Sequence, residues 1–399
     1  MPPLAGLKVV ELARVLAGPW AGQVLADLGA EVVKVESLAG DETRTWGPPF
    51  IENRDGSRDA AYFHACNRGK QSVAVDFSTE PGREIVRRLI ASADVVIENF
   101  KAGSLAKYGL DYAASRALNP RIIYCSITGF GQDGPYRERP GYDFVVQAMG
   151  GIMELTGDPA GPPEKMGVAY ADIMTGIYAV IAVQAALTHR ERTGEGQAID
   201  MALLDTQVGT LANQAMNYLA SGRPPRRLGN AHPNIVPYQE FPTRDGHLVV
   251  AVGNDAQFRQ FVAVLGAPTL ADEAKYATNA ERVVNRDALI DELKALTVRF
   301  SREDLLMSLG EAGVPAGPIN TLAEVFADPQ VVHRGLRMDL PREGAAPVPS
   351  VRTPILLEKS QLAYRGASPR LGEHTVDVLS GLGYTEAEIQ RFKAGKVTN

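Results

Sequence analysis

The residue best suited to do chemistry is Asp172, a carboxylate set among small and apolar residues where a long apolar segment begins. Burying a carboxylate there is costly unless a partner satisfies it. One interpretation is structural: an N-cap or first-turn aspartate, stabilised by free N–H groups and the helix dipole. The other is chemical, because a rigid carboxylate ionised at neutral pH can act as a nucleophile. Taken alone, the pattern favours the structural interpretation.

The sequence lacks the motifs of several other chemistries. The turn Ala13–Pro19 has Gly18 and Gly22 nearby but not the G-x-G-x-x-G spacing that a dinucleotide pyrophosphate requires, so an NAD site is not expected. The six histidines are scattered, and no pair has helical i,i+4 spacing, so no metal site is predicted. Neither a G-x-S-x-G elbow nor a P-loop is present.

The elements that must position Asp172 begin as an alternation of apolar strands and helices. Strands are expected at 7–12, 31–36, 72–77, 94–98 and 121–127, and helices at 19–28, 80–92 and 170–192. Pro19 is expected to open the first helix and Gly29 to close it. Strands separated by helices of this length pair in parallel with right-handed crossovers, which predicts an α/β fold with a parallel sheet.

The pattern of the sequence changes after residues 222–229 (GRPPRRLG), which have the composition of a linker. Segments 238–241 and 247–252 flank Arg244, Asp245 and Gly246, a pattern typical of a hairpin. Helical segments then dominate to about residue 312, and a proline-rich extension follows. We therefore expect a smaller α+β domain after the first one.

Composition excludes several classes of protein. The 399 residues contain 41 Lys and Arg against 47 Asp and Glu, and this net charge of −6 argues against a nucleic-acid partner. The longest apolar stretch, 177–187, is about half of the ~20 residues that a membrane span needs, so no membrane partner is expected. No secretory signal pattern and only two cysteines, Cys66 and Cys125, lead us to expect a reducing, cytoplasmic location.

Six stretches of the chain follow one another in the order of a known family: GLKVVELARVLAGPWAGQVLADLGAEVVKVE (6–36), CNRGKQSVAVDF (66–77), IENFKAG (97–103), NPRIIYCSITGFGQDGPYRERPGYDFVVQAMGG (119–151), YADIMTG (170–176) and TGEGQAIDMALLD (193–205). Through these stretches the chain resembles, from end to end, the class III CoA-transferases, the family of formyl-CoA transferase and carnitine CoA-transferase.

The resemblance implies that Asp172 is the catalytic nucleophile. Its carboxylate would attack an acyl-CoA to give a mixed anhydride, and the CoA thiolate would return to form an aspartyl-CoA thioester. Both intermediates hydrolyse readily, so the site must exclude water. The small residues Ala169, Ala171 and Gly176 would leave room for the thioester. No tightly bound cofactor and no metal are implied, and coenzyme A thioesters are the substrates.

The resemblance also implies a set of CoA contacts. The matching positions are Val15, Leu16, Ser37, Val75, Asp76, Asn99, Phe100, Lys101, Lys107 and Tyr142. Two of these depart from the family pattern, since Ser37 and Lys107 stand where relatives often have an arginine. The glycine-rich lid of the formyl-CoA enzyme is absent, and residues 229–234 (GNAHPN) occupy that region.

Two alternatives to transfer remain: an α-methylacyl-CoA racemase and a catalytically inactive CoA-binding protein. Racemases carry a G-H-D histidine base about thirty residues before the aspartate, and here that triplet is Gly141-Tyr142-Asp143. A tyrosine with a pKa near ~10 is a poor base at neutral pH. An inactive protein would lack Asp172 or its motif, and both are present.

Finer matches resemble the succinate–hydroxymethylglutarate CoA-transferase subgroup: GDETRTWGPPF (40–50), NIVPYQEF (234–241), GVPAGPIN (313–320) and VFADPQVVHRGL (325–336). Members move CoA from succinyl-CoA to dicarboxylic acids such as glutarate or hydroxymethylglutarate. The free carboxylate of such an acid suits an arginine fork, and Arg44 is the candidate. Its alternative role is that of a solvated loop arginine.

The family architecture implies a large Rossmann-like domain from both chain ends (1–223 and 326–399) and a small domain at 224–325. It also implies that two ring-shaped subunits interlock as a homodimer.

Overall fold

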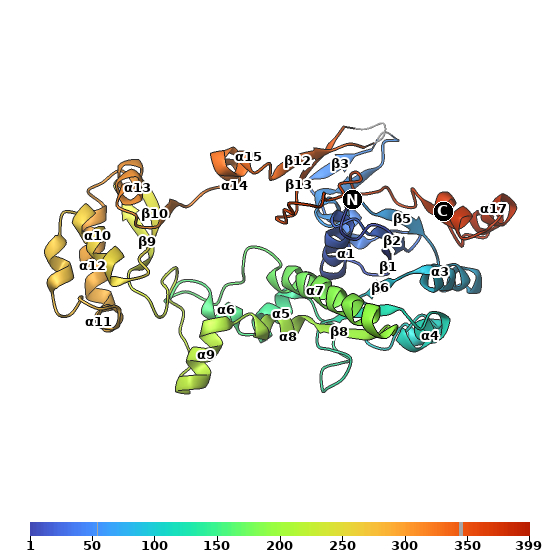
Figure 1. The fold of residues 1–399 in the computed structure, drawn as a ribbon, viewed down its shortest axis with the longest axis horizontal. Coiled ribbons are helices and arrows are strands. Elements are labelled where there is room, and N and C mark those ends of the chain that lie inside the picture. The colour runs from blue at the N-terminus through green and yellow to red at the C-terminus, as the bar shows by residue number, and fades with distance from the viewer. Residues whose placement is uncertain (54, 343–345) are drawn as a thin grey trace. The chain divides into compact units, whose positions relative to one another are not determined.

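The computed structural model describes residues 1–53, 55–342 and 346–399, which form two compact units (Figure 1). The larger unit consists of Met1–Ile152, Met166–Ala220 and His333–Asn399, and the smaller one of Met153–Lys165 and Ser221–Val332. The segment Met153–Lys165, which we expected in the large domain, thus belongs to the smaller unit.

A six-stranded sheet organises the larger unit. Its order is β5 (Gln71–Ala74), β2 (Glu31–Glu36), β1 (Lys8–Glu11), β6 (Val95–Glu98), β7 (Ile123–Thr128) and β8 (Ala198–Ala202). Every neighbouring pair is parallel, with Val9 opposite Val32 on one side and Val95 on the other. The predicted parallel α/β fold is therefore confirmed.

Helices cover both faces of this sheet, as Figure 1 shows. Val9 belongs to a core that includes residues of α1 (Ala17–Asp27) and α7 (Tyr170–Thr193). Its neighbour Val10 faces the opposite core, which includes residues of α3 (Glu80–Ser92), α16 (Thr375–Gly381) and α17 (Glu386–Ala394). Because both faces are buried, the strands read as nearly continuous apolar runs.

Helix α7 is long and apolar enough to cross a membrane by length and composition alone, although core helices meet the same criterion. Its apolar character follows from its packing against α1, β7 and β8. At Gly176 the two helices approach closely, since a Cβ there would lie 2.7 Å from the carbonyl oxygen of Ala17. Gly176 thus serves helix packing, which corrects the expectation that it leaves room for a thioester.

The remaining elements of the first 221 residues are short: η1 (Glu42–Thr45), β3 (Phe50–Glu52), β4 (Arg58–Ala60), α2 (Ala61–His64), η2 (Ala106–Tyr108), α4 (Tyr112–Leu118), α5 (Asp143–Met149), α6 (Ile152–Leu155), α8 (Leu203–Gly209) and α9 (Ala212–Ser221). The C-terminal part contributes α14 (Leu322–Ala327), α15 (Pro329–His333), β12 (Arg337–Leu340) and β13 (Val348–Val351).

The smaller unit has an antiparallel sheet of β9 (Tyr238–Thr243), β10 (Gly246–Ala251) and β11 (Ala316–Pro318). The hairpin between β9 and β10 turns at Arg244 and Asp245, as predicted. The helical segments of the smaller unit include α10 (Asp255–Val264), η3 (Pro268–Asp272), α11 (Asn279–Val284), α12 (Arg286–Thr297) and α13 (Arg302–Glu311), and α14 and most of α15 belong to the same unit. This unit has its own apolar core, which includes Phe241, Phe258 and Phe261.

One helix boundary differs from the prediction. Helix α1 begins at Ala17, so Pro19 is its third residue rather than its first. The missing N–H still costs nothing, because the first four N–H groups of a helix have no partner within it. Gly29 follows the helix with φ of 106°, consistent with the left-handed cap expected there.

A cluster of buried charges lies beneath the turn between β1 and α1. The ammonium of Lys34 is fully buried and reaches Glu11 Oε1 at 3.1 Å, Asp41 Oδ2 at 2.9 Å and the carbonyl of Ala13 at 2.8 Å. Burial alone would lower the pKa of Lys34, but the surrounding carboxylates raise it above its ordinary value. Lys34 is therefore a permanent cation with all three protons donated.

Lys70 extends the same cluster. Its ammonium lies 2.8 Å from Glu11 Oε2 and donates to the carbonyl of Pro19 and to Asn67 Oδ1 at 2.8 and 2.9 Å. Glu11 of β1 is thus joined to β2 through Lys34 and to the loop before β5 through Lys70, and Lys70 also holds the first helix through the carbonyl of Pro19. We call Glu11, Lys34, Asp41 and Lys70 the buried charge cluster.

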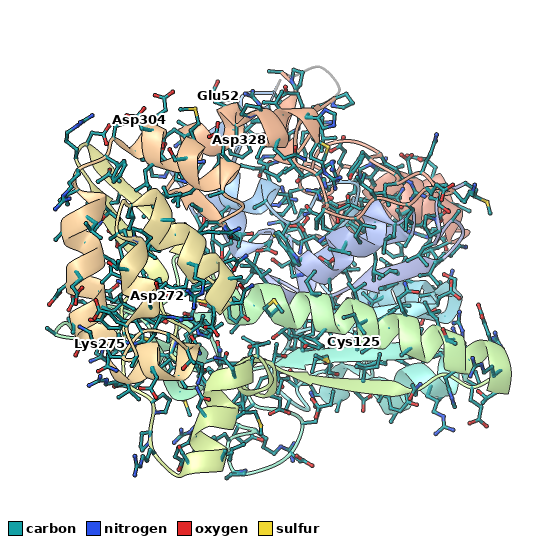
Figure 2. The ribbon with its side chains drawn as sticks, turned by 60° about the vertical axis from the view of Figure 1, so that its left-hand side comes forward. Glu52, Cys125, Asp272, Lys275, Asp304 and Asp328 are labelled. Atoms are coloured by element: carbon teal, nitrogen blue, oxygen red, sulfur yellow. The ribbon has the colours of Figure 1, made fainter. Side chains whose placement is uncertain are left out.

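We predict that Lys34→Met destabilises the protein by ~3–5 kcal/mol, because Glu11 and Asp41 would keep buried charges without this partner. Urea unfolding at pH 7 measures the loss. The matched control is Arg259→Met, since Arg259 pairs at 2.8 Å with Asp272 (labelled in Figure 2) on the surface and should cost less than ~1 kcal/mol. A Lys34→Met protein as stable as the control would contradict this role of the buried charge cluster.

Candidate active site

A cavity of about 420 Å³ opens in the larger unit where strands β1, β6 and β7 end. Carboxyl ends of parallel strands are the usual place for ligands in α/β sheets. Asp172 lines this cavity, and so do six of the positions expected to contact CoA: Val15, Leu16, Asn99, Phe100, Lys101 and Tyr142. The fold therefore brings together residues that are up to 157 positions apart in the sequence (Val15 and Asp172).

Asp172 is the third residue of α7 and so lies in its first turn. A different carboxylate caps this helix, since Asp143 Oδ1 accepts the backbone N–H groups of Ala171 and Asp172 at 2.8 and 3.3 Å. Among the described residues, no donor lies within hydrogen-bond distance of the Asp172 carboxylate. The structural interpretation of Asp172 as an N-cap is therefore wrong, although its first-turn position is as expected.

The neighbourhood of Asp172 makes its negative charge costly. Burial raises the pKa of its carboxyl to about 7, and the charge of Asp143 adds to this rise. The carboxyl of Asp172 is thus much harder to ionise at neutral pH than that of an ordinary aspartate, whereas we expected a group that is fully ionised there. A weakly solvated carboxylate that no hydrogen bond satisfies has its lone pairs available for attack on a carbonyl carbon.

Asp143 is held in turn by a close approach of two backbone segments. Gly129, just after β7, packs against Gly141, where an added Cβ would lie 2.3 Å from the Gly129 Cα. Gln147 donates to Asp143 Oδ2 at 2.7 Å. In this triplet, Gly141 allows the close contact with the segment after β7, and Asp143 caps α7.

Val15 carries the backbone strain of the site. Its φ of 68° lies in the left-handed region, which a β-branched residue rarely adopts. The Val15 N–H points to Asp41 of the buried charge cluster, at 3.3 Å from Oδ2. Next to it, Asn99 accepts the Arg14 N–H at 2.8 Å and donates to the Arg14 carbonyl at 2.6 Å, so the loops after β1 and β6 are clamped together.

Cations border the same cavity. Arg14 pairs with Glu42 at 3.0 Å, and Lys101 pairs with Glu138 at 2.9 Å. Arg139 also lines the cavity and stacks on the ring of Tyr136, with no carboxylate within ion-pair distance among the described residues. All of these pairs are exposed, so a more highly charged anion such as a phosphate could replace the carboxylate partner at little cost.

Four expected contact residues lie outside the cavity lining. The hydroxyl of Ser37 donates to the carbonyl of Gly40, and Val75 is buried in a sheet core. Asp76 accepts the Ser78 N–H, and the Lys107 ammonium sits over the Tyr108 ring. Their contacts with CoA stay predictions.

The structure corrects the interpretation of Arg44 as the substrate fork. Its side chain is 6% exposed, and its guanidinium lies 2.7 Å from Glu36 Oε1 and 3.0 Å from Asp59 Oδ1. It also stacks on the ring of Phe63 and donates to the carbonyl of Pro369. Because these partners already use the guanidinium, Arg44 holds the fold together and is neither a substrate ligand nor a solvated loop residue.

Sequence reasoning missed Asp143 as a neighbour of Asp172, and it missed two further groups with raised pKa values outside the lining of this cavity, Tyr62 and Glu98. Burial, with the charge of Asp172 next in importance, raises the pKa of Tyr62 to about 12. Burial also raises the pKa of Glu98 to about 7, although this carboxylate accepts the Phe100 N–H at 2.8 Å. Only Asp143 had a sequence signal, the Gly-Tyr-Asp triplet that we compared with the racemase pattern.

Within the described ranges, no three His, Cys, Asp or Glu side chains are grouped so that they could hold a metal ion.

Comparison with known proteins identifies the class of enzyme. Residues 4–375 match CoA-transferase family III. The chain belongs to this family. It is 58% identical to the succinate–glutarate CoA-transferase of Agrobacterium fabrum over 96% of each chain. It is also 45% identical to human succinyl-CoA:glutarate CoA-transferase, over 94% of this chain and 85% of the human one.

A solved structure agrees with this assignment. The crystal structure of a CaiB/BaiF family protein from Brucella suis is 60% identical, with a TM-score of 0.85 over 95% of this chain and 99% of that chain. The protein is thus a family III CoA-transferase, an enzyme whose substrates are CoA thioesters. The comparisons therefore favour a transferase over the two alternatives, an α-methylacyl-CoA racemase and a catalytically inactive CoA-binding protein.

We predict that Asp172→Asn makes this CoA-transferase more stable at high pH. A pKa raised from 3.8 to about 7 means that ionisation of Asp172 opposes folding. The penalty is near zero at pH 4, grows between pH 4 and 7, and is complete above that range. The variant should gain roughly 2–4 kcal/mol at pH 8 and little at pH 4 in urea unfolding.

The control for this prediction is Asp205→Asn, because Asp205 is an exposed first-turn aspartate of α8 outside the cavity. It should change stability by less than ~1 kcal/mol at either pH. A stability gain of Asp172→Asn that is the same at pH 4 and pH 8 would show that its carboxyl has an ordinary pKa.

Proposed function

We propose that this CoA-transferase moves CoA from succinyl-CoA to a dicarboxylic acid such as glutarate or hydroxymethylglutarate, with Asp172 as nucleophile. The observation that carries the proposal is the Asp172 carboxylate itself: it stands in the motif YADIMTG, lines the cavity half-buried, and has no hydrogen-bond donor among the described residues. The succinate and glutarate named for its relatives support this choice of donor and acceptor.

The reaction proceeds through two covalent states of Asp172. Its carboxylate attacks the thioester carbonyl of the donor, the C–S bond breaks, and CoA leaves as a thiolate, giving an aspartyl–acyl mixed anhydride. The thiolate then attacks the aspartyl carbonyl and releases the donor acid, which leaves an aspartyl-CoA thioester. The acceptor carboxylate repeats these two steps in reverse order, and Asp172 is regenerated.

The residues around Asp172 suit each stage. Asp143 accepts the backbone N–H groups of Ala171 and Asp172. These N–H groups are therefore not available to the Asp172 carboxylate, whose reactivity a hydrogen bond would lower. The half-buried position of the carboxyl reduces access of water, which would hydrolyse both intermediates. The proposal assigns Arg14, Lys101 and Arg139 to the phosphates of CoA or to the free carboxylate of the acid, in place of Arg44.

We also propose that the enzyme is a homodimer of interlocked subunits. Large apolar side chains are exposed on α5, α7, α8 and α9, including Phe144, Ile181, Val208, Met216 and Leu219, which are 51–71% exposed in the single chain. Exposed large apolar side chains are a feature of protein–protein interfaces when they lie together on the surface. A second copy of the chain is the proposed occupant, and no membrane or nucleic acid is part of the proposal.

A cytoplasmic location completes the proposal. It is supported by Cys66 and by Cys125 (labelled in Figure 2), both of which are free thiols buried in the larger unit. Burial raises the pKa of both thiols, so they remain protonated and unreactive.

We predict that Asp172→Asn lowers the rate of CoA exchange from succinyl-CoA to glutarate by several orders of magnitude, because an amide lacks the anionic nucleophile. Incubating the wild type with succinyl-CoA alone should add the mass of CoA less water to the peptide that contains Asp172. Borohydride should reduce this thioester to a homoserine-like residue. Intact-protein and peptide mass spectrometry, with an exchange assay by liquid chromatography, provide the measurements.

Asp205→Asn is again the matched control and should keep full exchange activity. Full activity in Asp172→Asn, or an adduct on Asp143 instead, would rule out the proposed nucleophile. A panel of mono- and dicarboxylic acids in the same assay tests the acceptor class: equal rates with butyrate and glutarate would argue against a dicarboxylate acceptor.

We predict that the dimer persists at nanomolar concentration, because interlocked subunits cannot separate without opening a ring. Analytical ultracentrifugation with fluorescence detection should show a single species of about twice the 42.9 kDa chain mass. A folded, monomeric population that grows on dilution would contradict the interlocked arrangement.

A further inference from the structure

A second cavity, of about 550 Å³, lies wholly within the smaller unit. It shares no lining residue with the cavity of Asp172. Its cationic lining comes from two places: residues 226 and 227, within the segment that we predicted to be a linker, and one face of helix α12.

The α12 face has a simple pattern of cation, apolar residue and cation. Arg286, Ile290 and Lys294 follow one another at i, i+4 and i+8, so they share one side of the helix. At ~1.5 Å per residue, the two cationic positions are separated by roughly 12 Å along the helix. The positive groups of Arg286 and Lys294 thus lie on either side of the apolar side chain of Ile290.

Arg286 is fixed in place before any ligand arrives. Its Nη2 donates to the carbonyls of His232 and Pro233 at 2.8 and 3.0 Å. Its Nη1 is buried and has no acceptor among the residues that the structure describes. A guanidinium that is already oriented and still has free protons loses little entropy when it binds an oxyanion.

Arg226 brings a second positive charge to the same end. Burial lowers the pKa of Arg286, and the nearby charge of Arg226 lowers it further, so the two guanidinium groups repel one another. In the described part of the chain, no carboxylate lies within ion-pair distance of Arg226, Arg286 or Lys294. An anion between the two arginines would relieve this repulsion.

Carboxylates also border the cavity, and they set its net charge. Glu154 is neutralised by Arg227 at 3.0 Å. Asp287 and Asp291 remain, and Asp287 partly offsets the charge of Arg286. The three cations without an ion-pair partner (Arg226, Arg286 and Lys294) outnumber these two aspartates, so the cavity has a net positive charge. On the helix, each aspartate directly follows Arg286 or Ile290.

We propose that this cavity binds an elongated dicarboxylate, with one carboxylate at Arg226 and Arg286, the other at Lys294, and the methylene chain over Ile290. This would be a binding site distinct in its residues from the cavity of Asp172. It does not depend on the proposed reaction, because its lining residues include neither Asp172 nor any other residue of that cavity.

Isothermal titration calorimetry on the full chain tests the proposal, with Asp172→Asn as background so that no turnover occurs. Glutarate should bind in a saturable way, and pentanoate, which has the same five carbons but one carboxylate, should bind at least tenfold more weakly. Pyrophosphate serves as the phosphate probe. Glutarate affinity should fall at least tenfold in Arg226→Gln and in Lys294→Gln, and should rise in Asp287→Asn, which removes a competing charge.

The matched control is Lys275→Gln, because Lys275 (labelled in Figure 2) is an exposed lysine of the same unit that pairs with Glu273 and Glu292 and does not line the cavity. It should leave glutarate binding unchanged, and circular dichroism should show that every variant is folded. Pentanoate binding as tightly as glutarate, or pyrophosphate binding tighter than glutarate, would overturn the dicarboxylate assignment.

The proposal would also be wrong if glutarate affinity were the same in Arg226→Gln, Lys294→Gln and the control. Glutarate would then bind elsewhere, for example in the cavity of Asp172. Exchange activity measured without the Asp172→Asn background is a separate readout, so failure of this site and failure of the proposed reaction can be told apart.

Discussion

The larger unit depends on one constraint: two lysines and two carboxylates that are buried together must neutralise one another completely. Lys34 and Lys70 share Glu11, and Lys34 also holds Asp41. Because an unpaired charge cannot be tolerated in such surroundings, this cluster fixes how β1, β2 and the first helix meet. Asp41 then faces the N–H of Val15, so the same electrostatic requirement extends to a strained residue of the cavity wall.

Asp172 represents the opposite arrangement. The charges of the buried charge cluster are paired with one another, whereas Asp172 is half-buried beside another carboxylate, and among the described residues it has neither a cation nor a hydrogen-bond donor as partner. Such a group costs stability in its ionised form, and the fold tolerates this cost because α7 is anchored along its length on α1 and the sheet. Arg44 and Asp172 thus illustrate two uses of burial: the first stabilises the fold, and the second keeps a carboxylate reactive.

Local patterns predicted most of the elements that hold the site. The strands at 31–36 and 94–98, the helix at 80–92 and the hairpin around Asp245 were all visible, because periodicity and turn residues act over a few positions. The first residue of α1 was misplaced by two positions, since several neighbouring residues can begin a helix at similar cost. The segment Met153–Lys165 was assigned to the wrong unit, because its partners are distant in sequence.

By itself, the sequence predicted the parallel α/β fold from the alternation of strands and helices, and its motifs resemble those of the class III CoA-transferases, which implied the family and the role of Asp172 as nucleophile. Only the tertiary structure decided the state of that carboxylate, because Asp143, 29 residues away, caps its helix and adds to its raised pKa. It likewise decided that Arg44 is a structural residue rather than a substrate ligand. The physical reason is that the energy of a charge depends on solvent exposure and on neighbours brought close by folding, and neither can be read from local sequence.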